Sequence, residues 1–170
     1  YLRGVHNAYN IACAIEACRA YGLKEADIKK GLETFKGVSG RLEFVKIYNG
    51  VSIYNDTCAT TPEALGVGLA ALAPHNKQSK LILIAGGTTK TLKLGLLPKI
   101  IKKYTKDVIL LPGTGTDELV KTIAKENFSI VKTLKEAVKE ACSRACPGDV
   151  ILFSPGFASF GMFKNEYDRG

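Results

Sequence analysis

The sequence predicts an α/β domain with a Rossmann-like, mostly parallel sheet and helices on both faces, preceded by a short helical segment. From residue 51 onward, apolar runs rich in β-branched residues alternate with segments of helical spacing. Such alternation is typical of parallel strands joined by crossover helices. Before them, Asn49-Gly50 separates two strand-like runs, which favours a type I′ hairpin and adds one antiparallel strand. With 46% hydrophobic residues in a chain of 170, a buried core is feasible.

The first 35 residues predict two helices. Residues 4–20 and 24–35 carry apolar side chains at helical spacing, and Gly22 between them is a suitable C-cap. Two helices cannot bury their apolar faces alone, so this piece needs a partner elsewhere. The side chains expected on the inward faces are Val5, Ala8, Ala12, Ile15 and Ala17 in the first helix, and Ala26, Ile28 and Leu32 in the second.

The segment GVSG at 37–40 is the expected linker. It divides the chain into a helical part, residues 1–38, and a second domain, residues 39–170. In the second domain we expect strands at 42–48, 51–54, 80–85, 107–111, 128–131 and 149–153, and helices at 62–72, 92–103, 115–126, 133–145 and from about 159.

Polar turns follow three of the predicted strands, at residues 55–61, 86–90 and 154–159. The first turn opens a helix, because Thr61 can act as the N-cap and Pro62 suits the first helical position. In α/β folds, ligands bind in the crevice at the carboxyl ends of the strands. We therefore expect the three turns to form one shared site.

Five residues in or near these turns can carry chemistry, and each has a plain structural alternative. Lys90 follows two glycines and can bind an anion, or it is a solvated turn lysine. Asp56 can hold a ribose or metal-bound hydroxyl group, or it closes an Asx-turn. Thr60 and Ser159 can donate to a carboxylate or can act as caps. Arg41 can bind a phosphate with both arms of its guanidinium, or it is a surface charge.

The overall composition narrows the partners. The formal charge of +8 fits anionic small ligands, whereas the lysines are spread along the chain and form no nucleic-acid-binding motif. The cysteines are odd in number, five, and form no CxxC pair, so we predict no metal site and a reducing, cytoplasmic environment. No apolar run is long enough to span a membrane, and we expect no membrane partner.

Five short segments, in this order, resemble motifs of the Mur ligase family. Residues 4–10 (GVHNAYN) are similar to GxHNxxN, 40–43 (GRLE) to the hinge motif HRxE, and 55–60 (NDTCAT) to NDSKAT. Residues 86–90 (GGTTK) are similar to GGxxK, and 154–170 to the ending SPxxASxDxFxNFExRG. The resemblance implies that residues 1–38 are the helical tail of a central ATP-binding domain and that residues 39–170 are the C-terminal ligase domain.

The resemblance also implies roles for single residues. In the family, one group contacts ATP, a second binds the carboxylates of the incoming amino acid, and Arg41 and Lys90 are the residues expected to be catalytic. The implied contacts are to ATP for Asn7, Asn10, Arg41 and Asp56, to the α-carboxylate for Thr60 and Lys90, and to the side-chain carboxylate for Ser159 and the backbone near Phe160.

The reaction that the resemblance implies is ATP-dependent amide formation in peptidoglycan precursor synthesis. ATP and Mg²⁺, bound mainly by the central domain, would convert the carboxylate of UDP-N-acetylmuramoyl-L-alanine to an acyl phosphate, which the amine of D-glutamate attacks. This role connects the protein to cell wall biogenesis, cell shape and cell division. We expect a monomer that binds small molecules, and no turnover by this chain alone.

Three alternatives stay open at this stage. Cys58, Gly161, Glu166 and Tyr167 depart from the family pattern, which leaves room for a Mur-type or folylpolyglutamate-type ligase with another acceptor amino acid. The second alternative is a stand-alone Rossmann-like nucleotide-binding module, although this sequence has no GxGxxG motif after its first strand. The third is a basic nucleic-acid module, although the sequence has no aromatic stacking motifs; such a module would bind with a steep dependence on salt.

Overall fold

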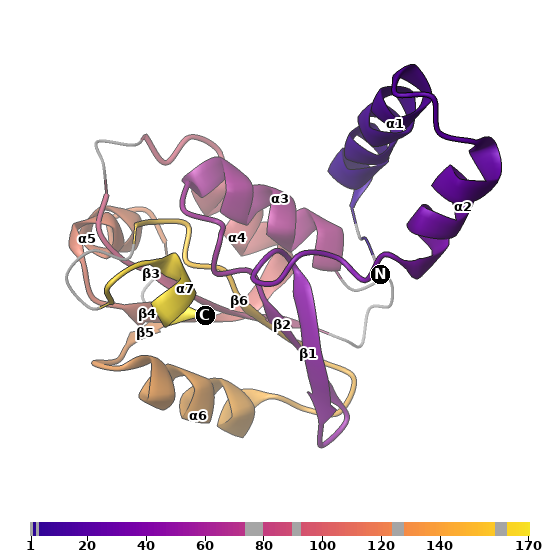
Figure 1. Cartoon of the computed structure of the whole chain (residues 1–170). Helices are drawn as coiled ribbons and strands as arrows, with labels where there is room; N and C mark the ends of the chain where they lie inside the picture. Colours follow the sequence, from indigo (N-terminus) through magenta and orange to yellow (C-terminus); the bar gives the residue numbers. More distant parts are fainter. Residues whose placement is uncertain (1, 3, 74–79, 90–92, 124–127, 159–162) are drawn as a thin grey trace.

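The computed structural model describes residues 2, 4–73, 80–89, 93–123, 128–158 and 163–170, and every structural statement below concerns these residues (Figure 1). The strands are β1 (Glu43–Tyr48), β2 (Val51–Asn55), β3 (Leu81–Gly86), β4 (Thr105–Leu111), β5 (Phe128–Ile130) and β6 (Val150–Phe153). The helices are α1 (Val5–Ala20), α2 (Glu25–Thr34), α3 (Pro62–Leu72), α4 (Leu97–Tyr104), α5 (Thr114–Val120), α6 (Leu134–Arg144) and α7 (Glu166–Arg169).

The strands form one sheet in the order β1-β2-β6-β3-β4-β5. The first pair is antiparallel and the other four pairs are parallel, which confirms the predicted fold class. At the hairpin, Asn49 has φ 50° and Gly50 has φ 77°, as a type I′ turn requires. β3 is buried along its whole length, because a central parallel strand is covered on both faces and so consists of a continuous apolar run.

Each face of the sheet has its own core. On one face, α3 and α4 pack with their apolar sides against β3, β4 and β6, and Leu65, Leu69, Leu97 and Ile101 are nearly inaccessible to solvent. On the other face, α6 supplies Ala137 and Ala141. Figure 1 shows α6 on one side of the sheet and α3 and α4 on the other. The predicted helices on both faces are therefore confirmed.

Two local sequence signals set where these helices begin. Thr61 is the N-cap of α3, and its hydroxyl oxygen accepts the backbone N–H of Ala64 at 3.2 Å. Thr133 and Glu136 form a reciprocal capping box at the start of α6. α3 thus begins directly after the turn that follows β2, which fixes this turn on the edge of the sheet.

The helical pair α1–α2 stands to one side of the domain (Figure 1). Gly22, with φ 90°, ends α1, and the backbone N–H groups of Gly22 and Leu23 bond to the carbonyls of Arg19 and Cys18, as in a Schellman motif. Most of the residues expected on the inward faces are exposed in this chain. No residue of α1, which the structure describes in full, is buried, and its half-buried positions are Asn7, Ile11, Ile15 and Cys18.

α1 contacts the rest of the described chain along one narrow side, and Val5 is 90% exposed. Helical spacing alone did not identify which side of α1 faces the second domain. In α2, Ile28 is buried, whereas Ala26 and Leu32 are exposed. Two boundaries differ by several residues: α4 begins at Leu97 rather than at 92, and α5 ends at Val120 rather than at 126. The predicted helix from about 159 begins outside the described residues, and the structure describes α7 further along the chain.

Candidate active-site edge and nucleotide cavity

The three polar turns lie together at the carboxyl ends of β2, β6 and β3. The backbone N–H of Asp56 donates to the carbonyl of Phe153 at 2.7 Å, and that of Gly86 donates to the carbonyl of Pro155 at 2.9 Å. Thr88 and Ala158 exchange two backbone hydrogen bonds of 3.1 Å as an isolated antiparallel bridge. The predicted gathering of the turns on one edge is confirmed for their described parts.

A fourth segment, residues 112–116, lies with these turns and was not predicted. It comprises the turn after β4 and the first residues of α5. The hydroxyl oxygens of Thr116 and Thr114 accept the N–H groups of Gly87 at 3.3 Å and Thr89 at 3.2 Å. The N–H of Gly115 donates to the carbonyl of Gly87 at 2.9 Å. Glycine and threonine directly after an apolar strand were the available signal, since these residues commonly build turns.

A cavity of about 680 Å³ lies between the α1–α2 pair and the edge of the second domain. Its polar lining includes four residues that the resemblance assigns to ATP: Asn7, Asn10, Arg41 and Asp56. Its apolar lining includes Ile11, Leu32, Phe35, Val38 and Leu42. The cavity thus brings together residues from the first helix, the linker and the first turn of the sheet edge.

Two of the cavity residues lie in the first turns of α1. Asn7 and Asn10 are three residues apart and project from the same side of the helix. The side-chain amide of Asn10 donates to the side-chain oxygen of Asn7 at 3.2 Å. This bond orients the amide of Asn10 relative to that of Asn7, and it presents a pair of polar side chains to the cavity.

Arg41 is exposed at the cavity, directly after the linker. Gly40 before it is buried, has φ 72°, and lies so close to the next turn that an added Cβ would be 2.8 Å from Cγ2 of Thr57. The N–H of Gly40 donates to the carboxylate of Glu43 at 2.8 Å, and its carbonyl accepts the N–H of Cys58 at 3.0 Å. The linker is therefore fastened to the 55–61 turn, and this places Arg41.

Asp56 is buried, and both of its carboxylate oxygens have internal donors. One oxygen accepts the backbone N–H of Leu42 at 3.1 Å, and the other accepts the hydroxyl of Ser154 at 2.8 Å. Burial raises the pKa of Asp56 from 3.8 to about 6, although these two hydrogen bonds and the charge of Arg41 oppose the rise. Gly68 on α3 leaves the room that this carboxylate needs, because a Cβ there would be 2.9 Å from it.

The predicted site residues therefore divide into three groups. Asn7, Asn10, Arg41 and Asp56 line one cavity. Thr60 is half-buried in the same turn as Asp56 and is not among the residues that line the cavity. Lys90, Ser159 and Phe160 lie outside the described residues. The Asx-turn that we considered for Asp56 is formed instead by Asn55, whose side-chain oxygen accepts the N–H of Thr57 at 3.1 Å.

Cys58 lines the cavity, in agreement with its place in the NDTCAT segment, where the family pattern NDSKAT has a lysine. Sequence reasoning missed one residue at this edge. Arg169 is 2% exposed, and its guanidinium reaches the 55–61 turn. Arginine is most often exposed, so the available signal was only that Arg169 matches the arginine of the family ending SPxxASxDxFxNFExRG.

Within the described residues, no three His, Cys, Asp or Glu side chains gather in a way that could hold a metal ion. Across the same residues, no helix has the length and apolar character needed to cross a membrane. The absence of a metal site from the whole chain stays a prediction.

The sheet topology and the polar carboxyl edge define an α/β ligand-binding domain. Residues 40–157 match the model of the family described as Mur ligase, glutamate ligase domain, and the chain belongs to this family. The predicted family is therefore confirmed.

Known proteins agree with this assignment. The chain is 41% identical over 174 residues to "UDP-N-acetylmuramoylalanine--D-glutamate ligase" of Roseiflexus sp., a match that covers 99% of the chain and 36% of that relative. It is 40% identical to the protein of the same name from Desulfitobacterium hafniense, over 99% of the chain and 37% of the relative. The chain thus spans little more than a third of the length of these curated relatives.

A solved structure shows the same fold. The UDP-N-acetylmuramate-alanine ligase MurC from Thermotoga maritima matches with a TM-score of 0.71 at 20% identity, over 91% of the chain and 35% of that protein. At this identity, the likeness bears on the fold alone.

Proposed function

We propose that this chain is the C-terminal domain, with the end of the central domain, of an ATP-dependent ligase that adds D-glutamate to UDP-N-acetylmuramoyl-L-alanine. Membership of the Mur ligase family and the names of relatives such as that from Roseiflexus sp. support the proposal. The observation that carries it is that Asn7, Asn10, Arg41 and Asp56 line a single cavity. These four residues come from three separate segments of the sequence, and the resemblance assigns all four to ATP.

The properties of the cavity fit a nucleotide. Its volume of about 680 Å³ lies in the range typical of small-molecule sites. Apolar side chains such as Ile11 and Phe35 suit a base, and the amides of Asn7 and Asn10 offer it hydrogen bonds. Arg41 would face the terminal phosphate, with a guanidinium geometry that matches phosphate oxygens. When bound, ATP supplies the phosphoryl group that activates the substrate carboxylate.

Asp56 would lie against the ribose. Its carboxylate accepts two internal hydrogen bonds, and an ionised carboxylate has about four acceptor positions, so it keeps capacity for a ribose hydroxyl. Because the pKa of Asp56 is about 6, it is mostly ionised at neutral pH. We propose that Mg²⁺ is held mainly by parts of the ligase outside this chain, since the described residues offer no cluster of three ligands.

The amino acid would bind at the sheet edge beside the cavity. We assign its α-carboxylate to Thr60 and Lys90, and its side-chain carboxylate to Ser159 and the backbone near Phe160. The support is the pairing of Thr88 with Ala158, because it ties the strand end that leads to Lys90 to the strand end that leads to Ser159. Two basic or hydroxyl donors on adjoining turns suit a dicarboxylate.

The further proposals concern the whole protein. We propose that it is a cytoplasmic monomer that serves peptidoglycan synthesis, and hence cell shape and division. We also propose that this chain alone has no turnover, because the resemblance places the modified lysine and the phosphate-binding loop of the family in the central domain. Closure of the C-terminal domain over the others would orient the substrates and exclude water.

The test is phosphate release by the complete ligase with ATP, Mg²⁺ and UDP-N-acetylmuramoyl-L-alanine. D-glutamate, L-glutamate, L-lysine and meso-diaminopimelate are compared as acceptors. Release with D-glutamate alone is expected, and it would show that Cys58 and Glu166 are tolerated variants of the family pattern. Release with another acceptor would keep the ligase mechanism and change the substrate, and no release with any acceptor would contradict the proposed activity.

Two variants of the complete ligase test the residue roles. Lys90→Ala should raise the KM for the amino acid at least about tenfold, since it removes a charged partner of a carboxylate. Arg41→Ala should lower kcat/KM for ATP by a similar factor. Lys93→Ala, which removes a nearby exposed lysine, is the control and should leave both parameters unchanged.

A further inference from the structure

Arg169, the penultimate residue of the chain, is buried at the site edge with 2% of its surface exposed. Its guanidinium donates to the carbonyl of Thr57 at 2.7 Å and to the hydroxyl of Thr57 at 3.2 Å. A third N–H donates to the carbonyl of Phe157 at 3.1 Å. One side chain therefore bonds to two different turns of the edge, 55–61 and 154–158.

The geometry of arginine is required for this link. A guanidinium presents five N–H donors in a rigid plane, whereas a lysine ammonium is a compact charge on a flexible stem. Burying such a cation is costly unless its donors are satisfied. Arg169 is nevertheless buried at the site, where its guanidinium bonds to the turn that carries Asp56 and Cys58.

The C-terminal tail, residues 163–170, is built to hold Arg169 in this place. Phe163 packs against the core on the α6 face of the sheet. Asn165 caps α7, because its side-chain oxygen accepts the N–H of Asp168 at 2.9 Å. The carbonyl of Gly170 accepts the side-chain amide of Asn55 at 3.4 Å, and Gly170 lies so close to Thr57 that a Cβ would be 2.6 Å from its Cγ2.

We propose that Arg169 is a positioning residue that fixes the distance between the two halves of the ligase site. The 55–61 turn carries Asp56, on the nucleotide side, and the 154–158 turn leads to Ser159, on the amino-acid side. By bonding to both turns, Arg169 holds the bound nucleotide and the bound amino acid in register. This inference rests on the proposed function, because it assigns one substrate to each turn.

The consequence is a separation between binding and turnover. Without the guanidinium, each turn keeps its own backbone hydrogen bonds, such as that from Cys58 to Gly40 and that from Ala158 to Thr88. The turns also stay joined at their bases, because the hydroxyl of Ser154 donates to Asp56 and the N–H of Gly156 donates to the carbonyl of Ala59, both at 2.8 Å. Each half of the site can therefore still form. The distance between Thr57 and Phe157, which Arg169 spans, is less fixed, and small misplacements of reacting groups lower rates strongly.

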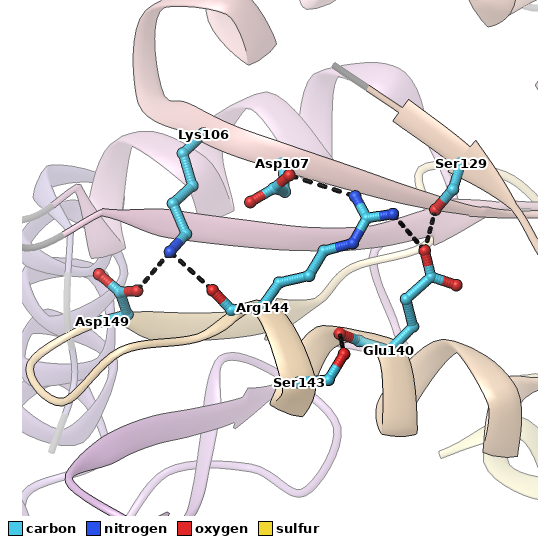
Figure 2. A network of polar contacts seen from close by, with 7 residues as sticks. All are labelled: Lys106, Asp107, Ser129, Glu140, Ser143, Arg144 and Asp149. Atoms are coloured by element: carbon cyan, nitrogen blue, oxygen red, sulfur yellow. Dashed lines mark hydrogen bonds and ion pairs between the residues drawn. The ribbon is translucent and has the colours of Figure 1, made fainter. Parts of the chain in front are cut away.

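The experiment compares Arg169→Lys and Arg169→Met in the complete ligase with matched controls at Arg144. Arg144 also bonds to two acceptors, Asp107 at 3.2 Å and Glu140 (Figure 2). Asp107 lies near the amino end of β4, whereas the site lies at the carboxyl ends of the strands. For all variants, kcat with D-glutamate and the Kd for ADP are measured at a temperature where every variant is folded. The Tm of each variant is measured separately by thermal unfolding. Amide hydrogen exchange of the two turns is measured on the same samples.

Arg169→Lys should lower kcat about tenfold or more and leave the Kd for ADP within about twofold. Amide exchange should accelerate at residues 57–59 and 156–158 and stay unchanged in β4. Arg144→Lys should lower the Tm and leave kcat unchanged. Equal loss of kcat in the Arg169 and Arg144 variants, or unchanged kcat and exchange in the Arg169 variants, would overturn the proposal.

The two proposals fail in different ways. Wild-type enzyme without turnover would contradict the proposed function. Amide exchange then decides on Arg169, because turns that exchange no faster in Arg169→Lys would show that its guanidinium does not fix them. If Arg169→Met does not fold, Arg169→Lys keeps a charged donor in the tail and carries the test.

Discussion

Two buried carboxylates at opposite ends of the parallel strands have pKa values that are shifted in opposite directions. Strand β6 is flanked by Asp149 before its amino end and by Ser154 after its carboxyl end, where the site lies. Both Asp149 and Asp56, the partner of Ser154, are buried. The pKa of Asp149 is held below its ordinary value, whereas that of Asp56 is raised to about 6.

The edge at Asp149 is a network of paired charges, shown in Figure 2. Burial alone would raise the pKa of Asp149, but Lys106 at 2.7 Å and the backbone N–H groups of Cys146 and Lys80 outweigh it. Nearby, Arg144 joins Asp107 and Glu140, and Glu140 accepts the hydroxyl of Ser129 at 2.6 Å. The paired charges at this end of the strands stabilise the folded protein.

The edge at Asp56 is held by backbone hydrogen bonds, glycines and hydroxyl groups. Its buried carboxylate has Ser154 and Leu42 as donors, while Arg41 acts from a distance and is exposed to solvent. The comparison teaches that the same strands are stabilised at one end and carry an energetic cost at the other. Functional sites commonly carry such a cost.

The largest effect is expected from Gly86→Ala at the site edge. Gly86 has φ 117°, and a Cβ would lie 2.3 Å from the carbonyl oxygen of Leu111. The free energy of unfolding should fall by at least about 3 kcal/mol, measured by urea denaturation. Gly95→Ala is the control, since Gly95 has φ 55° with nothing within 4 Å, and it should cost only about 1 kcal/mol. Equal losses would show that close packing at the edge is not the cause.

Asp149→Asn should have the next largest effect. The amide keeps the shape of the side chain but leaves Lys106 without its charged partner in a largely buried place. We expect a loss of about 3 kcal/mol in the free energy of unfolding, because breaking a buried ion pair exposes the full desolvation cost of the remaining charge. A loss below that of a surface substitution would contradict the stabilising role of this edge.

The pH dependence of stability distinguishes the two carboxylates. Because the pKa of Asp56 is raised in the folded protein, its contribution to stability is full below pH 3.8 and is lost as the pH rises through 6. A rise from 3.8 to about 6 corresponds to at most about 3 kcal/mol. Asp149 has the opposite sign, since its lowered pKa gives stability that is lost only as the pH falls below its ordinary value.

Asp56→Asn should therefore remove the decline in stability between pH 4 and 6. Its amide can accept from Leu42 and donate to Ser154, so folding is preserved. Denaturation midpoints at several pH values measure the slope. A slope between pH 4 and 6 that is the same in wild type and variant would contradict the raised pKa of Asp56.

The smallest effect is expected from Glu118→Gln. Glu118 and Lys121 form an exposed pair at 2.7 Å, with side chains 56% and 64% exposed. Solvent screens such pairs, so the free energy of unfolding should stay the same within the precision of urea denaturation. A loss as large as that of Asp149→Asn would mean that burial does not determine how much each ion pair contributes to the free energy of unfolding.

The sequence predicted the fold well because the fold depends on local signals. Asn49-Gly50, Thr61 and the apolar run of β3 each act within a few residues, and all three were interpreted correctly. The strand order and the fourth segment at 112–116 could not be predicted, since they depend on which strands pair across the chain. For the same reason, the burial of Arg169 became visible only when residues more than 100 positions apart were placed together.

The most direct test of the central claim is the affinity of the complete ligase for ADP, measured by titration calorimetry. Asn10→Ala removes a cavity amide and should weaken binding about tenfold. Cys13→Ala, on the same helix at an exposed position that does not line the cavity, should leave the Kd unchanged. Equal affinity of wild type and Asn10→Ala would contradict the assignment of the cavity to the nucleotide.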